Sequence, residues 1–200
     1  MTSQKPIEYT NKYTSFSRDE ILKDVSASMS KKRFKHVLGV EETAIELAKF
    51  YGEDIERVSL AALLHDYAKE QAEAEMLDLI ISENMDLDLT QYGSAIWHGP
   101  VGATLARREF GIEDEEILNA IANHTIGAPT MGLVEQIIFV ADYIEPGRDF
   151  EGVKKARELV EESIHEAVRY EMEQTIQHLL SNKMKIYPKA IDSYNAWVAN

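Results

Sequence analysis

The amino-acid sequence predicts an all-α protein, a helical bundle of roughly nine or ten helices. Apolar residues recur at three- and four-residue intervals from Ser17 onward. No segment alternates apolar and polar residues as a half-buried β-strand would. Glycine, proline and capping residues separate the periodic segments, as expected where helices begin and end. We therefore expect residues 1–16 to form an N-terminal tail and residues 17–200 to form a single domain.

The first part of the chain contains four predicted helices. Ser17 opens a capping-box pattern, which starts a helix with one apolar face. A longer apolar stripe follows and ends at Gly52, since glycine is the favoured residue just past a helix C-terminus. Residues 55–64 are apolar almost all round, which indicates a central buried helix. A shorter helix is expected at residues 72–82, followed by a loop at residues 85–90.

The remaining helices are separated by clear turn signals. Pro100 is expected to be the first residue of a helix that runs to residue 110, because proline suits the first helical position. A helix at residues 114–123 precedes a loop rich in Gly, Pro and Thr at residues 125–132. Residues 133–144 form another buried helix. Two or three amphipathic helices complete the chain, the last of them opened by Pro188.

Composition excludes several classes of function. The 200-residue chain is 44% hydrophobic and can bury a core without cross-links. It has no cysteine, which excludes disulfides, iron–sulfur clusters and thiolate zinc sites. Its formal net charge of -14 repels nucleic acid and anionic membranes. The N-terminus has no signal-peptide pattern, and apolar runs such as residues 137–141 are too short to span a bilayer. We expect a cytoplasmic protein that binds neither nucleic acid nor membrane.

Two carboxylates lie where apolar residues would be expected. Asp142 interrupts the apolar run at residues 139–144, and Asp66 follows His65 at the end of the central apolar helix. A buried carboxylate is costly unless it is paired, protonated or bound to metal. Imidazole and carboxylate together suit a divalent transition metal such as iron, manganese, cobalt or zinc. Such a metal can activate water for attack on phosphorus.

Three more histidines fall at informative places in the chain: His36, His98 and His124. Taken one at a time, each is more simply a core or boundary residue. Asp66 alone could cap a helix end, and Asp142 alone could pair with Arg148. The combination in chain order favours a shared site instead. His165 and His178 lie on an acidic amphipathic helix and are expected to face solvent.

The order His36, His65-Asp66, His98, His124, Asp142 resembles the HD-domain superfamily of metal-dependent phosphohydrolases. Five local segments narrow the resemblance to the YqeK family of bacterial symmetrical diadenosine tetraphosphate hydrolases: residues 33–40, 61–70, 98–103, 122–127 and 141–148. The resemblance covers nearly the whole chain. The family's His-Thr-Thr-Gly run appears here as His124-Thr125-Ile126-Gly127, so the second threonine hydroxyl is missing.

The resemblance implies an HD-domain-like bundle that hydrolyses diadenosine tetraphosphate to two ADP by attack of metal-activated water on a phosphoanhydride. It assigns a metal to four residues: His36, His65, Asp66 and Asp142. His98 and His124 match positions that either hold a second metal, with Asp66 as a bridge, or contact substrate phosphate. Iron, as one or two ions, is the metal that the resemblance implies, and other divalent transition metals stay open.

Five residues are candidates for substrate binding besides the two histidines: Arg33, Lys69, Thr125, Arg148 and Tyr187. If the helix continues past Asp66, Lys69 lies on nearly the same face three residues later, and its ammonium can reach a phosphate at the metal. Asp66 and Lys69 are the candidate catalytic residues. Arg148 can bind a phosphate bidentately, Arg33 lies beside a proposed ligand, and Thr125 can donate a hydroxyl hydrogen bond. The alternatives are a surface role for Lys69 and Arg33, and a simple packing helix around Tyr187.

Two other functions stay open at this stage. The nearest is another HD phosphohydrolase, acting on nucleoside monophosphates or guanosine alarmones. The other is a nucleotide-binding regulatory module with little turnover, although such a module would not need a complete ligand set. An apolar stripe on a helical bundle would also allow a homodimer, so the oligomeric state is open.

Overall fold

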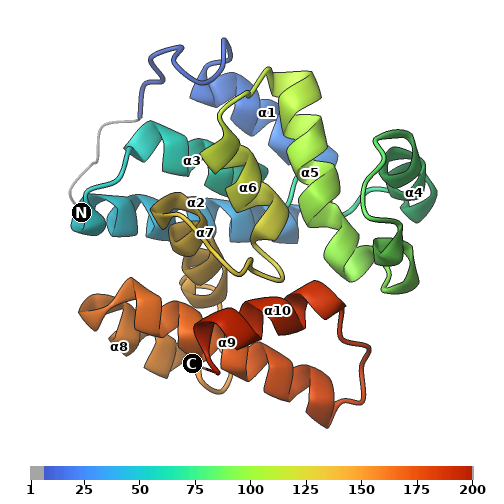
Figure 1. The fold of residues 1–200 in the computed structure, drawn as a ribbon. Coiled ribbons are helices and arrows are strands. Elements are labelled where there is room, and N and C mark those ends of the chain that lie inside the picture. The colour runs from blue at the N-terminus through green and yellow to red at the C-terminus, as the bar shows by residue number, and fades with distance from the viewer. Residues whose placement is uncertain (1–6, 200) are drawn as a thin grey trace.

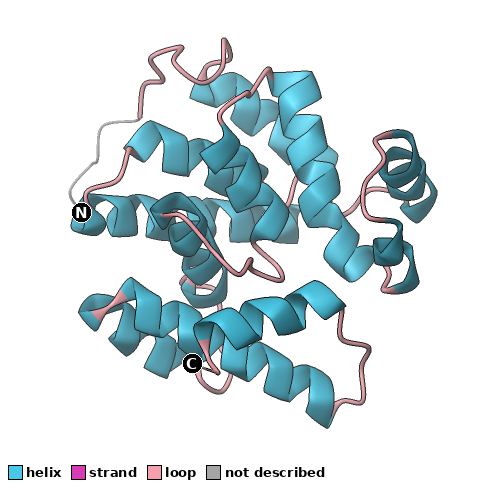
Figure 2. Cartoon of the chain, viewed as in Figure 1, coloured by secondary structure: helices cyan, strands magenta, loops and turns pink. Residues whose placement is uncertain are grey.

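The computed structural model describes residues 7–199, which form ten α-helices and one 3₁₀-helix (Figure 1). The elements are α1 (Arg18–Ser28), α2 (Lys31–Tyr51), α3 (Ile55–Leu64), α4 (Glu73–Ser82), η1 (Leu87–Gln91), α5 (Ser94–Phe110), α6 (Glu115–Asn123), α7 (Leu133–Ile144), α8 (Val153–Glu162), α9 (Ile164–Ser181) and α10 (Pro188–Trp197). Figure 2 shows helices and loops, with no strand among the described residues. The prediction of an all-α fold is confirmed.

Several helix boundaries follow from local capping chemistry, as the sequence predicts. The Ser17 side chain accepts a hydrogen bond from the Glu20 N–H, and the Glu20 carboxylate accepts one from the Ser17 N–H, which completes the capping box of α1. Gly52 ends α2 in the left-handed conformation at φ 79°. Asp54 caps α3 by accepting hydrogen bonds from two backbone N–H groups of its first turn. Pro188 opens α10.

The start of α5 differs from the prediction. The helix begins at Ser94, and Pro100 lies inside it, so the prediction that Pro100 opens the helix is wrong. Proline costs one helical hydrogen bond because it has no N–H. Packing of the extra N-terminal turns offsets that loss. The Trp97 side chain is buried there, and its Nε1–H donates to the Leu89 carbonyl at 2.6 Å.

The segment that was predicted to be a loop at residues 85–90 is largely the 3₁₀-helix η1. Asp86 caps it by accepting a hydrogen bond from the Asp88 N–H. The buried Leu89 side chain anchors the helix in the core. The loop prediction is wrong because this burial stabilises a short turn that has no helical periodicity of its own.

Helix α7 is the centre of the molecule. It packs against α2, α3, α6, α8 and α9, and most of its side chains are buried. Figure 1 shows α8, α9 and α10 grouped on one side of the molecule, with α1 to α6 on the other and α7 between them. The Asp142 side chain on α7 is therefore mostly enclosed, with 21% of it exposed.

Residues 7–16, part of the expected tail, lie against α3 and the end of α5. The Tyr9 and Ser59 hydroxyls are 2.8 Å apart, and Thr10 donates two hydrogen bonds to the Glu56 carboxylate. The buried Thr14 hydroxyl donates to the Phe110 carbonyl at 2.6 Å. Residues 1–6 lie outside the described residues, and the division into a tail and one domain stays a prediction. Across residues 7–199, no helix combines the length and the hydropathy needed to cross a membrane.

Candidate metal centre

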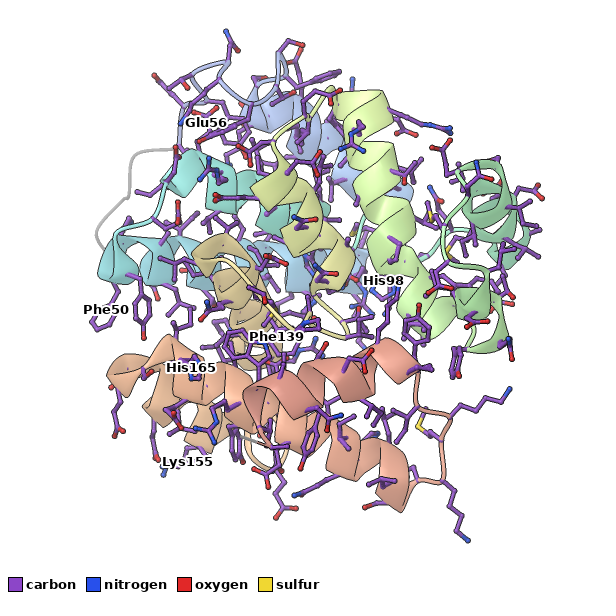
Figure 3. The ribbon with its side chains drawn as sticks, in the orientation of Figure 1. Phe50, Glu56, His98, Phe139, Lys155 and His165 are labelled. Atoms are coloured by element: carbon purple, nitrogen blue, oxygen red, sulfur yellow. The ribbon has the colours of Figure 1, made fainter. Side chains whose placement is uncertain are left out.

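The structure brings the six predicted metal-centre residues together from five different places in the fold. His36 lies on α2, and His98 and Asp142 lie on α5 and α7. His65 ends α3 and is followed by Asp66, and His124 ends α6. Four of them are only 0–3% exposed: His65, Asp66, His98 and His124. Figure 3 labels His98 in the zone between α5 and α10.

Asp66 lies between two groups of imidazoles. Its Oδ2 atom is 3.3 Å from His65 Nε2 and 3.6 Å from His36 Nε2. Its Oδ1 atom is 3.3 Å from His98 Nε2 and 3.7 Å from His124 Nε2. We call the Oδ2 side, with His36, His65 and Asp142, the first half of the centre. We call the Oδ1 side, with His98 and His124, the second half.

The donor atoms of the first half are arranged for a cation. His36 Nε2 and His65 Nε2 are buried and have no hydrogen-bond partner. His36 Nε2 lies 3.0 Å from Asp142 Oδ1, yet the two atoms are not aligned for a hydrogen bond. Buried polar atoms normally have a hydrogen-bond partner. Two buried imidazole nitrogens without one, close to two carboxylates, therefore fit a divalent metal.

Backbone carbonyls orient two of the rings. His65 Nδ1 donates to the Ala62 carbonyl at 2.7 Å, and His124 Nδ1 donates to the Ile121 carbonyl at 2.8 Å. Both bonds run back one helical turn, because each histidine ends its helix. In the neutral ring, Nε2 then keeps its lone pair and points into the centre, which is the tautomer that a metal requires.

Burial and mutual charge set the protonation states. Burial alone would raise the pKa of Asp66, but His65, His124 and His98 hold that pKa well below its usual value. Burial alone would lower the pKa of His65, but Asp66 and Asp142 raise it. Burial lowers the pKa of His98 to about 4. Asp66 is therefore ionised and His98 neutral at neutral pH, the forms in which each can ligate a metal.

Three basic side chains line the centre of this acidic protein. Arg33 Nη1 donates to Asp66 Oδ2 at 2.7 Å, and Arg148 Nη2 donates to Asp142 Oδ1 at 2.6 Å. The pairing of Asp142 with Arg148 that the sequence left open is thus present. Lys69 Nζ lies 3.3 Å from both ring nitrogens of His98, and burial lowers the pKa of Lys69.

The other two predicted substrate residues differ in their surroundings. Thr125 Oγ1 lies 3.2 Å from His98 Nε2 and 3.1 Å from His124 Nε2, directly at the second half. Tyr187 donates its hydroxyl to Asp86 at 2.7 Å, and its ring packs edge-on against another tyrosine near η1. The substrate role of Tyr187 stays a prediction.

One contact of the centre was not anticipated from the sequence. The Glu145 carboxylate lies 3.1 Å from His36 Nδ1 and is 5% exposed. The position of Glu145 in the sequence could have indicated that it lies near the centre. Glu145 follows Asp142 by three residues at the end of a helix, which places both on the same helical face.

Comparisons with known proteins agree with this geometry. The HD domain family model matches residues 33–147. The symmetrical bis(5'-nucleosyl)-tetraphosphatase of Halalkalibacterium halodurans is 44% identical over 90% of this chain and 96% of its own. The protein of the same name from Bacillus subtilis is 40% identical over 92% of this chain and 98% of its own.

A solved structure extends the agreement to the fold. The crystal structure of a predicted HD superfamily hydrolase involved in NAD metabolism, from Clostridium acetobutylicum, superimposes with a TM-score of 0.88 at 36% identity. The match covers 92% of this chain and 98% of that one. The chain therefore belongs to the HD-domain family, and within it to the group that contains the symmetrical bis(5'-nucleosyl)-tetraphosphatases.

Proposed function

We propose that this protein is a metal-dependent hydrolase that cleaves diadenosine tetraphosphate symmetrically to two ADP. The observation that carries the proposal is the buried His/Asp centre with three basic side chains around it. Two relatives at 44% and 40% identity, each matched over nearly its whole length, are named symmetrical bis(5'-nucleosyl)-tetraphosphatases, and they support the choice of substrate. Water adds across the central anhydride, so that its oxygen joins one middle phosphorus and the bridging oxygen leaves with the other.

The metal that we propose is iron, as one or two ions, with other divalent transition metals as alternatives. Four residues would hold the first ion: His36, His65, Asp66 and Asp142. A divalent ion supplies activated water at neutral pH and offsets charge on phosphoryl oxygens. His98 and His124, together with Asp66, would hold a second ion, or the two histidines would contact the substrate phosphate. Their Nε2 atoms lie 2.9 Å apart, so both could contact the same ion or phosphate oxygen.

The basic residues would bind the tetraphosphate. Arg33 and Arg148 bond to Asp66 and Asp142, and each guanidinium can turn its remaining N–H donors to a phosphate. Lys69, which is partly buried, would neutralise charge on the leaving ADP. The Thr125 hydroxyl would donate a hydrogen bond to the same phosphate. These local positive charges offset the repulsion that the net charge of -14 exerts on an anionic substrate.

An apolar cavity lies beside the second half, and we propose it as the place for one base of the substrate. It has a volume of about 160 Å³ and lies between α5, α7, α9 and α10. Thr125 is part of its wall, and Ile96, Phe139 and Met172 are among the apolar residues that line it. Pockets of this kind, with few polar groups, suit a flat base. Tyr187 lies at the start of α10, and we keep it as a proposed contact to base or ribose.

A product assay tests the proposal directly. Purified protein loaded with metal should convert diadenosine tetraphosphate to ADP alone, and AMP plus ATP would contradict a symmetrical cut. A panel of nucleoside monophosphates, guanosine alarmones and NAD, compared by kcat/KM, would separate the other HD hydrolase activities. Tight ADP binding without turnover of any of these substrates would favour a regulatory module.

Metal analysis of anaerobically purified protein would identify the native ion and its stoichiometry. Sedimentation of the same sample tests the homodimer, and fractionation of cells tests the expected cytoplasmic location.

A further inference from the structure

Glu145 joins the end of α7 to the first half of the centre. Its Oε1 atom lies 3.1 Å from His36 Nδ1, and its Oε2 atom accepts a hydrogen bond from the Gly147 N–H. An ionised carboxylate has no proton to give, so His36 Nδ1 must be the donor. The neutral His36 ring then keeps its lone pair on Nε2, the atom that faces Asp66 and Asp142 without a hydrogen bond.

Two glycines leave room for this carboxylate. A Cβ atom at Gly39 would lie 2.6 Å from Glu145 Oε2, and one at Gly147 would lie 2.9 Å from both carboxylate oxygens. Neither glycine adopts a positive φ, so backbone freedom does not explain them. The close packing of both glycines against the Glu145 carboxylate explains why a larger residue does not fit at these two positions. Gly39 also follows His36 by three residues on α2, so both lie on the helical face that meets Glu145.

The backbone around Glu145 is held from a different helix. Arg157 on α8 donates from Nε to the Ile144 carbonyl at 2.9 Å. Its Nη2 atom donates to the Glu145 carbonyl at 2.9 Å and to the Arg148 carbonyl at 3.1 Å. One side chain therefore ties together the last carbonyls of α7 and the turn after it. Arg157 lies beyond residue 147, where the match to the HD domain model ends.

We propose that Glu145 is a positioning residue that holds His36 in the Nδ1–H tautomer and aims its Nε2 atom at the metal. The proposal rests on His36 being a metal ligand, as proposed above. Partners of this kind typically contribute about 10–100-fold to metal affinity. A purely structural Glu145 would affect stability but neither the tautomer of His36 nor the metal affinity.

Gly39→Ala and Glu145→Ala test the proposal from opposite sides. Gly39→Ala keeps Glu145 and favours the helix, but its methyl group displaces the carboxylate, which is the mobile end of a flexible side chain. It therefore remains informative if Glu145→Ala folds poorly. Glu135→Ala is the matched control, because Glu135 is a buried α7 carboxylate that also accepts one side-chain and one backbone hydrogen bond.

The tautomer is read from long-range ¹H–¹⁵N spectra of the imidazoles in metal-free protein at a fixed mildly alkaline pH. The His36 signals are assigned by their loss in His36→Gln. The wild type and Glu135→Ala should show a protonated Nδ1 on His36. Gly39→Ala and Glu145→Ala should shift His36 toward the Nε2–H form. An unchanged His36 spectrum in both variants would overturn the proposal.

Metal affinity is measured separately by calorimetric titration of the same metal-free proteins with Mn²⁺. Gly39→Ala and Glu145→Ala should bind about 10–100-fold more weakly than the wild type, with Glu135→Ala close to the wild type. Equal weakening by Glu135→Ala would also overturn the positioning role. If His36→Ala itself leaves the affinity unchanged, then the ligand assignment of His36 fails, and that failure is distinct from the failure of Glu145 alone.

Discussion

Asp66→Asn is the substitution that most directly tests the two-half organisation of the centre. The structure places one carboxylate oxygen of Asp66 toward each half, at 3.3–3.7 Å from four imidazole nitrogens. Asparagine keeps the shape of the side chain but has one oxygen and no charge. It can therefore serve at most one half at a time, and it replaces the other acceptor with an amide group that repels a cation.

The size of the effect follows from the number of halves that lose a ligand. Loss of an outer-shell partner typically costs about 10–100-fold in affinity or activity, and loss of a direct ligand should cost at least as much. Because Asp66→Asn affects both halves, the two losses multiply, and kcat/KM should fall about 10²–10⁴-fold. This corresponds to roughly 3–5 kcal/mol of transition-state stabilisation. His36→Ala and His98→Ala each remove a ligand from one half only, so each should lose less than Asp66→Asn.

The assay combines ADP release with metal content after anaerobic purification. Circular dichroism of the metal-free proteins checks that Asp66→Asn stays folded. The expected order of kcat/KM is wild type, then the two single-half variants, then Asp66→Asn. If Asp66→Asn loses no more activity and no more metal than His36→Ala, then Asp66 does not serve both halves, and the bridging role is refuted.

Three further predictions concern neighbouring features. Lys69→Ala should lower kcat/KM for diadenosine tetraphosphate about tenfold or more with unchanged metal content. Lys69 is proposed to neutralise charge on the leaving ADP, and a hydrogen bond to a charged group is worth about 1.5–3 kcal/mol. Loss of metal in this variant would refute that role. The lowered pKa of His98, about 4, means that the unfolded chain binds the proton first as pH falls. Metal-free protein should therefore lose about 1.5 kcal/mol more stability than His98→Gln between pH 6.5 and pH 5 in urea titrations, and equal losses would contradict the assignment. Gly99→Ala would place a Cβ atom 2.6 Å from the Ala122 carbonyl oxygen, a rigid backbone atom, whereas Gly102→Ala meets a methyl group at 3.4 Å. Gly99→Ala should cost about 1–3 kcal/mol in thermal unfolding, clearly more than Gly102→Ala, and equal melting temperatures would count against this close approach.

Local signals in the sequence were sufficient for most helix boundaries. The capping box at Ser17 and the glycine at position 52 act within one helical turn, so their effect can be read without knowing the fold. The start of α5 could not be read in this way. Its first turns are held by the buried Trp97 and its bond to the Leu89 carbonyl, contacts that outweigh the local preference of Pro100 for a helix start.

For the candidate site too, part could be predicted from the sequence and part depends on the tertiary structure. The order of the six residues along the chain, together with the resemblance to the HD-domain superfamily, predicted them as one centre, and the structure brings them close together. The roles of Arg33, Lys69 and Arg148 were named only as candidates, since a basic residue near a site has an equally simple surface role. The contacts of Arg33 with Asp66 and of Lys69 with His98 depend on how α2, α3 and α5 pack. Arg148 contacts Asp142 locally, within the α7 segment and the turn after it.

The sequence by itself determined the helical class, because helical periodicity is local. It also determined the family and the ligand candidates, because the motifs that carry the resemblance to the HD-domain superfamily stand in the chain order. Only the tertiary structure decided that Asp66 faces both halves and that Glu145 contacts His36. Both facts require side chains from helices far apart in the chain to meet at distances near 3 Å. The same holds for Arg157, whose bonds to three carbonyls exist only because α8 packs against α7.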